Sequence, residues 1–331
     1  MVVSMATQKR LQFYRSADLK VWTRLSEFGP AGEPKKLNWE CPDVFELPIE
    51  GEPGKTRWVL EADMGSGAIA GGSGGEYFTG TFDGKQFIPD FTTSQWVDFG
   101  RDFYAPVSWS GIPASDGRRI WIGWMNNWET CLNPTSPWRS AMSIPRELTL
   151  KRIGGQLRLC QKPVRELQQL RDQKVEINDR LLSNESMPLE LRGQQLEILM
   201  EVQLDTATEF GVRVLQGKEE QTVIGYNTKT RSMYVDRTSS ANVTFHPAFS
   251  GRHAGPLEPT AQRNIRLHIL VDACSVEVFG NHGETVVTDL VFPHPDSKGI
   301  ELFASGGTCR LVSIRVHTLK SVWSSPANPQ P

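Results

Sequence analysis

A glutamate occupies an unusual position in the segment NWECPDVFEL, residues 38–47. Glu40 lies between Trp39 and Cys41, and Pro42 and an apolar, β-prone run follow it. Poorly solvated surroundings, such as those beside an indole ring, can keep a carboxyl group protonated. A protonated carboxyl group can donate its proton to a leaving group during catalysis. Glu40 is therefore a candidate general acid, and the alternative is a side chain that simply turns toward solvent.

The composition is that of a globular protein and excludes several functions. The chain has 331 residues, of which 38% are hydrophobic and 22% charged, enough material for two domains. The formal net charge is -2 and the two signs are interspersed, so no nucleic-acid partner is expected. No apolar run approaches the ~20 residues that span a bilayer, so no membrane segment is expected. The first ten residues also lack the features of a signal peptide.

The cysteines give no sign of a metal site or of a disulfide framework. All five are far apart and none belongs to a CxxC pair, the spacing typical of zinc sites. An odd number of cysteines at irregular spacing does not indicate loops joined by disulfide bonds either. We therefore expect free thiols in the cores, no metal and no cofactor.

Short alternating segments rich in Val, Ile, Trp, Tyr and Phe recur along the chain between Gly, Pro and Asp turns, for example TRWVLEADM, RRIWIGWM and SVEVFGN. This pattern predicts an all-β protein. One stretch, KPVRELQQLR at residues 162–171, has apolar side chains three positions apart at Val164, Leu167 and Leu170, and it predicts a helix. We interpret this helix as part of a hinge between two domains.

The first half of the chain repeats itself. WECPDVF at residues 39–45 and FYAPVSW at residues 103–109 share two aromatic residues and a proline at equal spacing, with an offset of 64. RWVLEADM and RIWIGWM follow in the same order, and YRSADLKVW and FTGTFDGKQF share a turn containing Asp18 or Asp83. Successive units of several short strands are typical of β-propeller blades. The alternative is coincidence among β-rich segments.

The repeat predicts where the candidate acid lies. The inner strand of each propeller blade lines the central channel, and the two repeated segments would be such strands. Glu40 and Tyr104 would then lie at the entrances of their strands and face a common funnel. Pro42 is expected to hold Cys41 in an extended conformation. The later strands, in residues 175–322, do not continue the repeat and predict a separate antiparallel sandwich.

Aromatic and amide side chains gather around the candidate acid. Indole rings can stack on the C–H face of a sugar, and amides can bind its hydroxyl groups. Trp39, Tyr104, Trp124 and Asn126 are therefore predicted to bind substrate. The alternative is that the tryptophans pack between blades, which we favour for Trp121 and leave open for Trp124.

With these motifs the sequence resembles glycoside hydrolase family 32, the β-fructosidases. The family's acid/base motif, Glu-Cys-Pro, is matched by residues 40–42. Further similar stretches, including DFYAPVSW, TSPWRSAMSIPRELTL and SVEVFGNHGETVVTDLVFP, follow in the family's order over nearly the whole chain. The resemblance implies a five-bladed β-propeller joined to a C-terminal β-sandwich. It also implies a retaining glycosidase that releases β-linked fructose from levan, inulin or sucrose, with Glu40 as general acid and then general base.

The repeat, the hinge and the resemblance together divide the chain into three parts. Residues 1–160 are expected to be the C-terminal blades of a five-bladed propeller catalytic domain, residues 161–174 a hinge helix or linker, and residues 175–322 the β-sandwich. The resemblance leaves localisation open. Members of the family that act on polymeric fructans are usually exported, and any signal peptide would lie upstream of residue 1.

The motifs that supply the family's second carboxyl group are not found in this sequence. Retaining glycosidases need two carboxyl groups about 5 to 5.5 Å apart, one as acid and one as nucleophile. In the family the nucleophile belongs to an Asn-Asp-Pro-Asn-Gly motif and a stabilising aspartate to an Arg-Asp-Pro motif, whereas this sequence contains no Asp-Pro dipeptide. We therefore expect the chain to begin inside the second blade and to be inactive alone. The alternatives are a catalytically inactive fructan-binding remnant and an arabinan-type hydrolase, against which the Glu-Cys-Pro motif argues.

Overall fold

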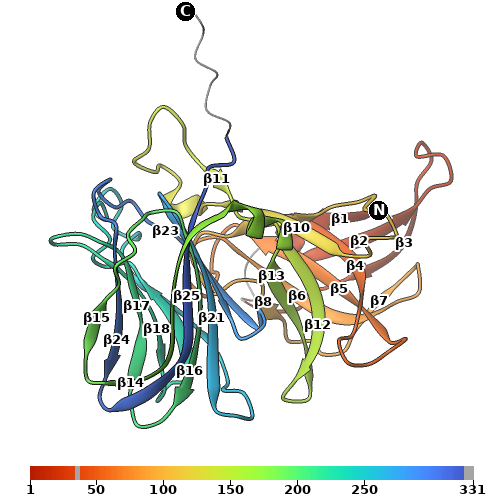
Figure 1. Ribbon diagram of the computed structural model, residues 1–331. Helices are drawn as coiled ribbons and strands as arrows, with labels where there is room; N and C mark the ends of the chain where they lie inside the picture. Colours follow the sequence, from red (N-terminus) through yellow and green to blue (C-terminus); the bar gives the residue numbers. More distant parts are fainter. Residues whose placement is uncertain (34–37, 324–331) are drawn as a thin grey trace, which may run out of the picture.

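The fold is built almost entirely from β-strands. The structure, a computed structural model, describes residues 1–33 and 38–323. Its strands form five antiparallel sheets, three small ones followed along the chain by two six-stranded ones (Figure 1). The helices found in the described residues are short 3-10 turns: η1 (Ala6–Gln8), η2 (Trp128–Thr130) and η3 (Arg165–Leu170). The predicted fold class, part of a five-bladed β-propeller followed by an antiparallel β-sandwich, is confirmed.

The three small sheets are the propeller blades. The first has the strand order β1-β2-β3, the second β4-β5-β6-β7 with β8 also paired to β6, and the third β9-β10-β12-β13 with β11 also paired to β10. Their strands are β1 (Val2–Met5), β2 (Arg10–Arg15), β3 (Thr23–Phe28), β4 (Glu40–Pro48), β5 (Thr56–Met64), β6 (Gly74–Phe82), β7 (Phe87–Pro89), β8 (Gln95–Trp96), β9 (Tyr104–Ser108), β10 (Arg119–Met125), β11 (Ala141–Met142), β12 (Arg146–Ile153) and β13 (Gln156–Pro163).

The inner strands β4 and β9 share the same local distortion. The register of β4 against β5 shifts by one residue after Glu40, and the register of β9 against β10 shifts in the same way after Tyr104. The next residue is left-handed in both strands, with φ 44° at Cys41 and φ 49° at Ala105. Such a bulge bends the strand and re-aims the side chains beside it. The prediction that Pro42 holds Cys41 in an extended conformation is therefore wrong, because the bulge requires a positive φ at that position.

The predicted repeat is also visible in two hairpin turns. In the β2–β3 hairpin the Asp18 Oδ1 atom accepts hydrogen bonds from the backbone N–H groups two and three residues later, at 2.9 Å each. In the β6–β7 hairpin Asp83 Oδ1 accepts the equivalent bonds at 2.8 and 2.7 Å. A carboxylate that bonds its own backbone in this way fixes a tight turn. The two turns therefore have the same construction in successive blades.

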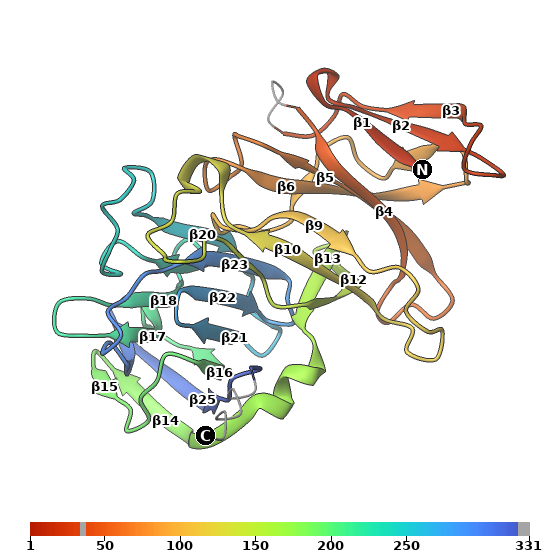
Figure 2. The same ribbon diagram turned by 90° about the horizontal axis from the view of Figure 1, so that it is seen from above.

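Hydrophobic side chains fill the spaces between successive blades. One cluster, which includes Leu11, Leu60 and Phe78, lies between the first and second sheets, and another, which includes Phe45 and Trp121, lies between the second and third. Seen from above, the three sheets lie side by side and the sandwich adjoins the third (Figure 2). The apolar face of each sheet is therefore covered by its neighbour, as in a propeller.

The connection between the two parts is shorter than the predicted linker of residues 161–174. Strand β13 continues to Pro163, and the next strand begins at Arg171. Between them lies η3, a 3-10 helix rather than an α-helix. The three-residue spacing of the apolar side chains matches the period of a 3-10 helix better than that of an α-helix.

Two six-stranded sheets form the sandwich, and their facing sides enclose the largest hydrophobic core. The first sheet has the order β14-β25-β16-β21-β22-β23 and the second the order β15-β24-β17-β18-β19-β20. The strands are β14 (Arg171–Ser183), β15 (Ser186–Pro188), β16 (Leu196–Leu204), β17 (Glu209–Gln216), β18 (Thr222–Asn227), β19 (Ser232–Asp236), β20 (Arg252–Pro256), β21 (Asn264–Asp272), β22 (Ser275–Gly280), β23 (Thr285–Leu290), β24 (Gly299–Ser305) and β25 (Thr308–Leu319).

Candidate active site

Glu40 is held by two side chains at the entrance of β4. The Tyr104 hydroxyl, from the neighbouring blade, donates a hydrogen bond of 2.5 Å to Glu40 Oε2. The Asn38 Nδ2 atom donates one of 2.6 Å to Glu40 Oε1. Each carboxyl oxygen therefore has one donor, and the group is half-buried rather than turned freely into solvent. Burial raises the pKa of the Tyr104 hydroxyl, and the hydrogen bond to Glu40 raises it further. The hydroxyl therefore keeps its proton and can donate it in a hydrogen bond to Glu40.

The bulges in the inner strands bring this pair together. Glu40 is the cross-strand partner of Asp63, and Tyr104 is the cross-strand partner of Trp124. Cross-strand partners lie side by side on one face of a sheet. The prediction from the repeat that Glu40 and Tyr104 occupy equivalent places and face the same space agrees with their direct contact.

Trp124 continues the wall beside Tyr104. Its ring lies edge-on to Tyr104, with centroids 6.2 Å apart, and 5.1 Å from the ring of Trp128. Its indole N–H donates to the Ser140 hydroxyl. Trp124 is partly exposed and Trp128 exposed, so apolar ring faces remain available beside the acid. Trp121, by contrast, is a packing residue with 0% exposure, as predicted.

Asn126 lies at the same end of β10 but only 1% of it is exposed. Its amide oxygen accepts a hydrogen bond of 2.9 Å from the backbone N–H of Asn127. The neighbouring Asn127 amide donates to the carbonyl oxygens of Gly71, Ser73 and Arg101, at 2.8 to 3.2 Å. Asn127 thus ties together loops around the acid. A direct contact between Asn126 and substrate stays a prediction.

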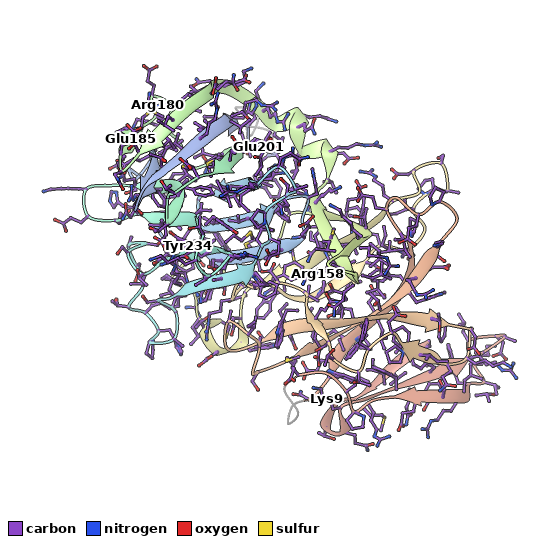
Figure 3. The ribbon with its side chains drawn as sticks, turned by 90° about the horizontal axis from the view of Figure 1, so that it is seen from below. Lys9, Arg158, Arg180, Glu185, Glu201 and Tyr234 are labelled. Carbon is purple, nitrogen blue, oxygen red and sulfur yellow. The ribbon has the colours of Figure 1, made fainter. Side chains whose placement is uncertain are left out.

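The prediction that Trp39 binds substrate is wrong. Its ring is 0% exposed, stacks on Phe28 with centroids 5.7 Å apart, and lies edge-on to Phe78. Its indole N–H donates a hydrogen bond of 2.6 Å to Glu76, which also forms an ion pair of 3.3 Å with Lys9. Figure 3 shows Lys9 in the N-terminal blade, away from the sandwich. Trp39 therefore joins the first two blades, because its ring packs in the hydrophobic cluster between them.

Two buried carboxyl groups behind Glu40 were not singled out from the sequence. Asp63, the cross-strand partner of Glu40, and Glu61, the partner of Asp43, are both 0% exposed. None of their four carboxyl oxygens forms a hydrogen bond of good geometry with the described residues. Burial raises the pKa of Asp63 and of Glu61 well above the usual range, and for Glu61 the Asp63 carboxyl raises the pKa further. Burial therefore favours the neutral form of both groups. The strand pattern EADM does not reveal this, because a polar residue at such a position usually faces solvent.

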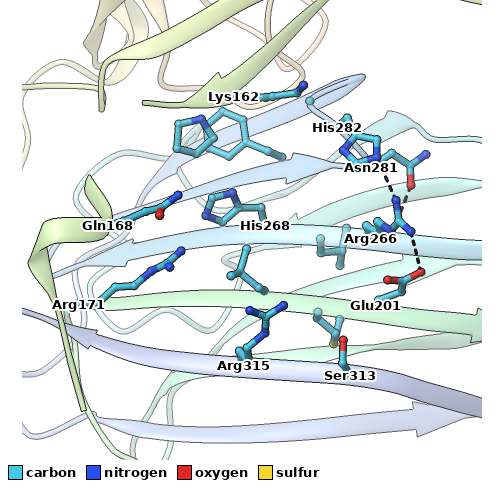
Figure 4. A pocket seen from close by; sticks show the side chains of 16 residues that line it. Lys162, Gln168, Arg171, Glu201, Arg266, His268, Asn281, His282, Ser313 and Arg315 are labelled. Carbon is cyan, nitrogen blue, oxygen red and sulfur yellow. Dashed lines mark hydrogen bonds and ion pairs between the residues drawn. The ribbon is translucent and has the colours of Figure 1, made fainter. Parts of the chain in front are cut away.

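A cavity that does not include Glu40 lies on the outer face of the sandwich beside η3 (Figure 4). It measures about 550 Å³ and is rich in basic side chains. Most of these are already paired: Arg171 and His268 both bind Glu197, at 2.5 to 2.9 Å, and Arg266 binds Glu201 at 3.1 Å. The cavity therefore carries little unsatisfied charge.

Neither metal ligands nor a membrane helix is found in the part of the chain that the structure describes. No group of three or more His, Cys, Asp or Glu side chains in residues 1–33 and 38–323 could hold a metal ion. No helix in these residues is long and apolar enough to cross a bilayer. All five cysteines, which lie within the described residues, are unpaired, but only Cys160 and Cys309 are buried, so the expectation that the thiols lie in the cores is wrong for the other three.

The fold and the site define a class of proteins in which a β-propeller with an acidic side chain at its inner strands is joined to a β-sandwich. Two family models match this chain: Glycosyl hydrolases family 32 N-terminal domain over residues 1–163, and Glycosyl hydrolases family 32 C terminal over residues 166–318. The chain belongs to glycosyl hydrolase family 32. The resemblance seen in the motifs is thereby confirmed.

Individual relatives agree with this assignment. The chain is 43% identical to a levanase of Bacillus subtilis over 98% of its own length and 49% of the levanase. It is 37% identical to an extracellular exo-inulinase of Aspergillus ficuum, over 98% of this chain and 62% of the inulinase. The chain thus spans only about half to three-fifths of the length of these two relatives.

Solved structures show the same arrangement. The exo-inulinase of Aspergillus awamori superposes with a TM-score of 0.91 and 34% identity, over 97% of this chain and 64% of the inulinase. The β-fructofuranosidase of Schwanniomyces occidentalis, complexed with fructosyl-erythritol, superposes with a TM-score of 0.87 and 28% identity, over 97% of this chain and 67% of that enzyme.

Proposed function

We propose that the complete protein is a retaining β-fructosidase that releases fructose from levan, inulin or sucrose. The observation that carries the proposal is the position of Glu40, whose two oxygens are each held by one donor, Tyr104 and Asn38, at the inner end of a blade. The names of the relatives, a levanase, an exo-inulinase and a β-fructofuranosidase complexed with fructosyl-erythritol, support this substrate class.

Glu40 acts first as acid and then as base. In the first step its proton moves to the glycosidic oxygen, the bond from that oxygen to the anomeric carbon breaks, and a carboxylate nucleophile forms the fructosyl–enzyme bond. In the second step Glu40 accepts a proton from water, whose oxygen displaces the nucleophile and completes the release of fructose. The donors from Tyr104 and Asn38 stabilise the ionised carboxylate between these steps and fix its orientation.

We further propose that this chain does not supply the nucleophile. The two carboxyl groups nearest to Glu40 along the strands are both engaged or enclosed. Asp43 accepts backbone hydrogen bonds of 2.8 and 2.9 Å from Val44 and Ser108. Asp63 is fully buried, and burial raises its pKa and so favours the neutral form, which makes it a poor nucleophile for an anomeric carbon. The absence of any Asp-Pro dipeptide supports the same proposal.

Trp124 and Tyr104 form the fructose subsite in this proposal, with Asn126 shaping the wall behind them. Trp124 offers a partly exposed ring face next to the acid, which suits the C–H face of a furanose ring. Tyr104 touches the acid itself. A second candidate function is that of a fructan-binding remnant. It would bind fructan on the same ring faces, but the whole protein, and not only this chain, would lack the nucleophile.

The test of the proposed function uses a version of the protein extended upstream to include a family nucleophile motif. Incubation with levan, inulin and sucrose is followed by an assay of released fructose, and proton NMR records the anomeric configuration of the first product. We expect fructose with the β configuration retained. Binding of these fructans without any release of fructose favours the remnant instead.

A further inference from the structure

Strand β23 of the sandwich holds the segment that leads into β9. Residues 98–103 connect β8 to β9 and run beside β23, the last strand of its sheet. The backbone N–H of Phe99 donates to the carbonyl oxygen of Val286 at 2.8 Å, and that of Asp102 donates to the carbonyl oxygen of Thr288 at 3.0 Å. The segment therefore extends the sandwich sheet as though it were one more strand, although it belongs to the propeller.

The side chains of Asp98 and Asp102 hold this segment against β23 by hydrogen bonds. Asp98 accepts hydrogen bonds from the backbone N–H of Thr288, at 2.9 Å, and from its hydroxyl, at 2.6 Å. Asp102 accepts a hydrogen bond of 2.8 Å from the backbone N–H of Leu290. Gly100 lies between Asp98 and Asp102 in the sequence. A Cβ atom added at Gly100 would lie 2.2 Å from backbone atoms of Thr288, so only glycine fits where this segment touches β23.

Buried charges of the sandwich complete the contact. Arg237 and Asp102 form an ion pair of 2.5 Å in which both side chains are fully buried. Asp289 accepts a hydrogen bond of 3.0 Å from the backbone N–H of Arg101 and pairs with His253 at 2.7 Å. Buried charges are costly unless they are paired, so these bonds favour a single position of the segment.

The other side of the same segment reaches the loops around the acid. The Arg101 guanidinium donates a hydrogen bond of 2.7 Å to the carbonyl oxygen of Ala70 and forms an ion pair with Glu129. The carbonyl oxygen of Arg101 accepts a hydrogen bond of 2.8 Å from Asn127. One side of residues 98–103 is thus fixed by the sandwich, while the other side fixes the walls of the candidate active site.

We propose that β23 is a positioning element for catalysis, with Thr288 as a positioning residue that acts on Glu40 through Tyr104. We call the contact between residues 98–103 and β23 the clamp. Tyr104 directly follows these residues, two positions after Asp102, and donates a hydrogen bond to Glu40. Displacements of about 1 Å in a catalytic arrangement can lower rates by about 100-fold. This inference rests on the proposed function of Glu40, and it assigns a role in the reaction to the sandwich.

The test uses the substitution Thr288→Val in the complete, active protein. Valine has the shape of threonine but lacks the hydroxyl that bonds Asp98 and also accepts a hydrogen bond of 2.7 Å from Arg146. Thr288→Ser, which keeps the hydroxyl, is the conservative variant. The matched control is Thr222→Val, since Thr222 is also a fully buried sandwich threonine with a hydrogen-bonded hydroxyl, 2.6 Å from that of Ser240, but lies in the other sheet.

We expect Thr288→Val to lower kcat/KM on sucrose by about 3- to 30-fold, which lies within the range measured for coupled residue pairs. It should also move the pH profile in the same direction as Tyr104→Phe. Thr288→Ser should restore both, and Thr222→Val should change stability alone. In a Tyr104→Phe background the effect of Thr288→Val should largely vanish, because both substitutions disturb the same hydrogen bond.

The inference is overturned if Thr288→Val behaves as Thr222→Val, or if its full effect persists without the Tyr104 hydroxyl. Should Thr288→Val not fold, Asp98→Asn alters the same clamp from the propeller side and carries the same expectations. Hydrogen exchange of residues 98–106 in the present chain provides a readout that needs no activity. Thr288→Val should speed exchange there and Thr222→Val should not, so this arm separates failure of the clamp from failure of the proposed function.

Discussion

The Tyr104 hydroxyl lies 2.5 Å from Oε2 of Glu40, although the two residues are 64 positions apart and belong to different blades. The same offset separates the two halves of the sequence repeat, so the repeat brings equivalent strand entrances together. Glu40, the proposed acid, is thus held by Tyr104, the residue at the equivalent position of the next blade.

We predict that Tyr104→Phe impairs catalysis while leaving the fold intact. A hydrogen bond to a charged group contributes about 1.5 to 3 kcal/mol, so kcat/KM of the complete protein should fall by about 10- to 150-fold. Removing a donor to a carboxylate favours its protonated form, so the basic limb of the pH–rate profile should move to higher pH. Steady-state kinetics over a pH series measure both effects, and an unchanged profile would show that Tyr104 only packs.

Glu61→Gln should make stability less dependent on pH. The pKa of Glu61 is raised in the folded protein, so folding favours the protonated carboxyl group. The stability that this provides is full below the pKa of the unfolded chain and is lost as the pH rises toward the pKa of the folded protein. Between these two pKa values, the free energy of unfolding falls by about 1.4 kcal/mol for each pH unit. A neutral amide does not lose this stability, so Tm should fall less between about pH 5 and pH 8 than in the wild type.

The control for this prediction is Glu46→Gln, since Glu46 is an exposed carboxyl group on the neighbouring strand β4. Thermal unfolding of all three proteins should give parallel curves for the wild type and Glu46→Gln, and a flatter curve for Glu61→Gln. Parallel curves for all three would mean that Glu61 is ionised in the folded state.

Trp39→Ala should destabilise the protein by about 3 to 5 kcal/mol, the usual cost of removing a large buried aromatic side chain. The loss also leaves Glu76 without its indole donor in a buried site. Urea unfolding of the present chain measures the change. Trp109→Ala, at a half-exposed tryptophan, should cost far less, and equal losses would contradict the position assigned to Trp39.

Much of the fold could be predicted because it depends on local patterns. Segments with alternating apolar residues predict strands whichever partner strand they pair with. Asp18 and Asp83 form turns through hydrogen bonds to backbone N–H groups a few residues away. Glu40 and Tyr104 could be related because the repeat preserves both spacing and order. The helix of the hinge was foreseen, but its 3-10 form and the extent of the flanking strands depend on pairing with distant residues.

Other features could not be predicted because they depend on which face of a strand is covered. Trp39 and Trp124 look alike in the sequence, yet the first is enclosed by Phe28 and Phe78 and the second is partly exposed. Glu61 alternates with apolar residues as a surface residue would, but the third blade covers that face. The bulge at Cys41 also reverses the conformation that a following proline normally favours.

The present chain alone should release no fructose from levan, inulin or sucrose. We propose that this chain does not supply the carboxylate nucleophile, and without it the fructosyl–enzyme bond cannot form. The assay compares the purified chain with a blank and with the complete protein. Turnover within the common range of about 1 to 10³ s⁻¹ would mean that a nucleophile lies among residues assigned here to the scaffold.

The assignment of Glu40 as acid/base is tested most directly by Glu40→Gln in the complete protein, assayed on two substrates. On sucrose, whose leaving group needs a proton, kcat/KM should fall by about 10² to 10⁴-fold. On a β-fructoside with an acidic phenol as leaving group, the formation of the fructosyl–enzyme bond should be largely spared, seen as a burst of released phenol. An equal loss on both substrates, with no burst, would contradict the account and leave Glu40 as a structural residue.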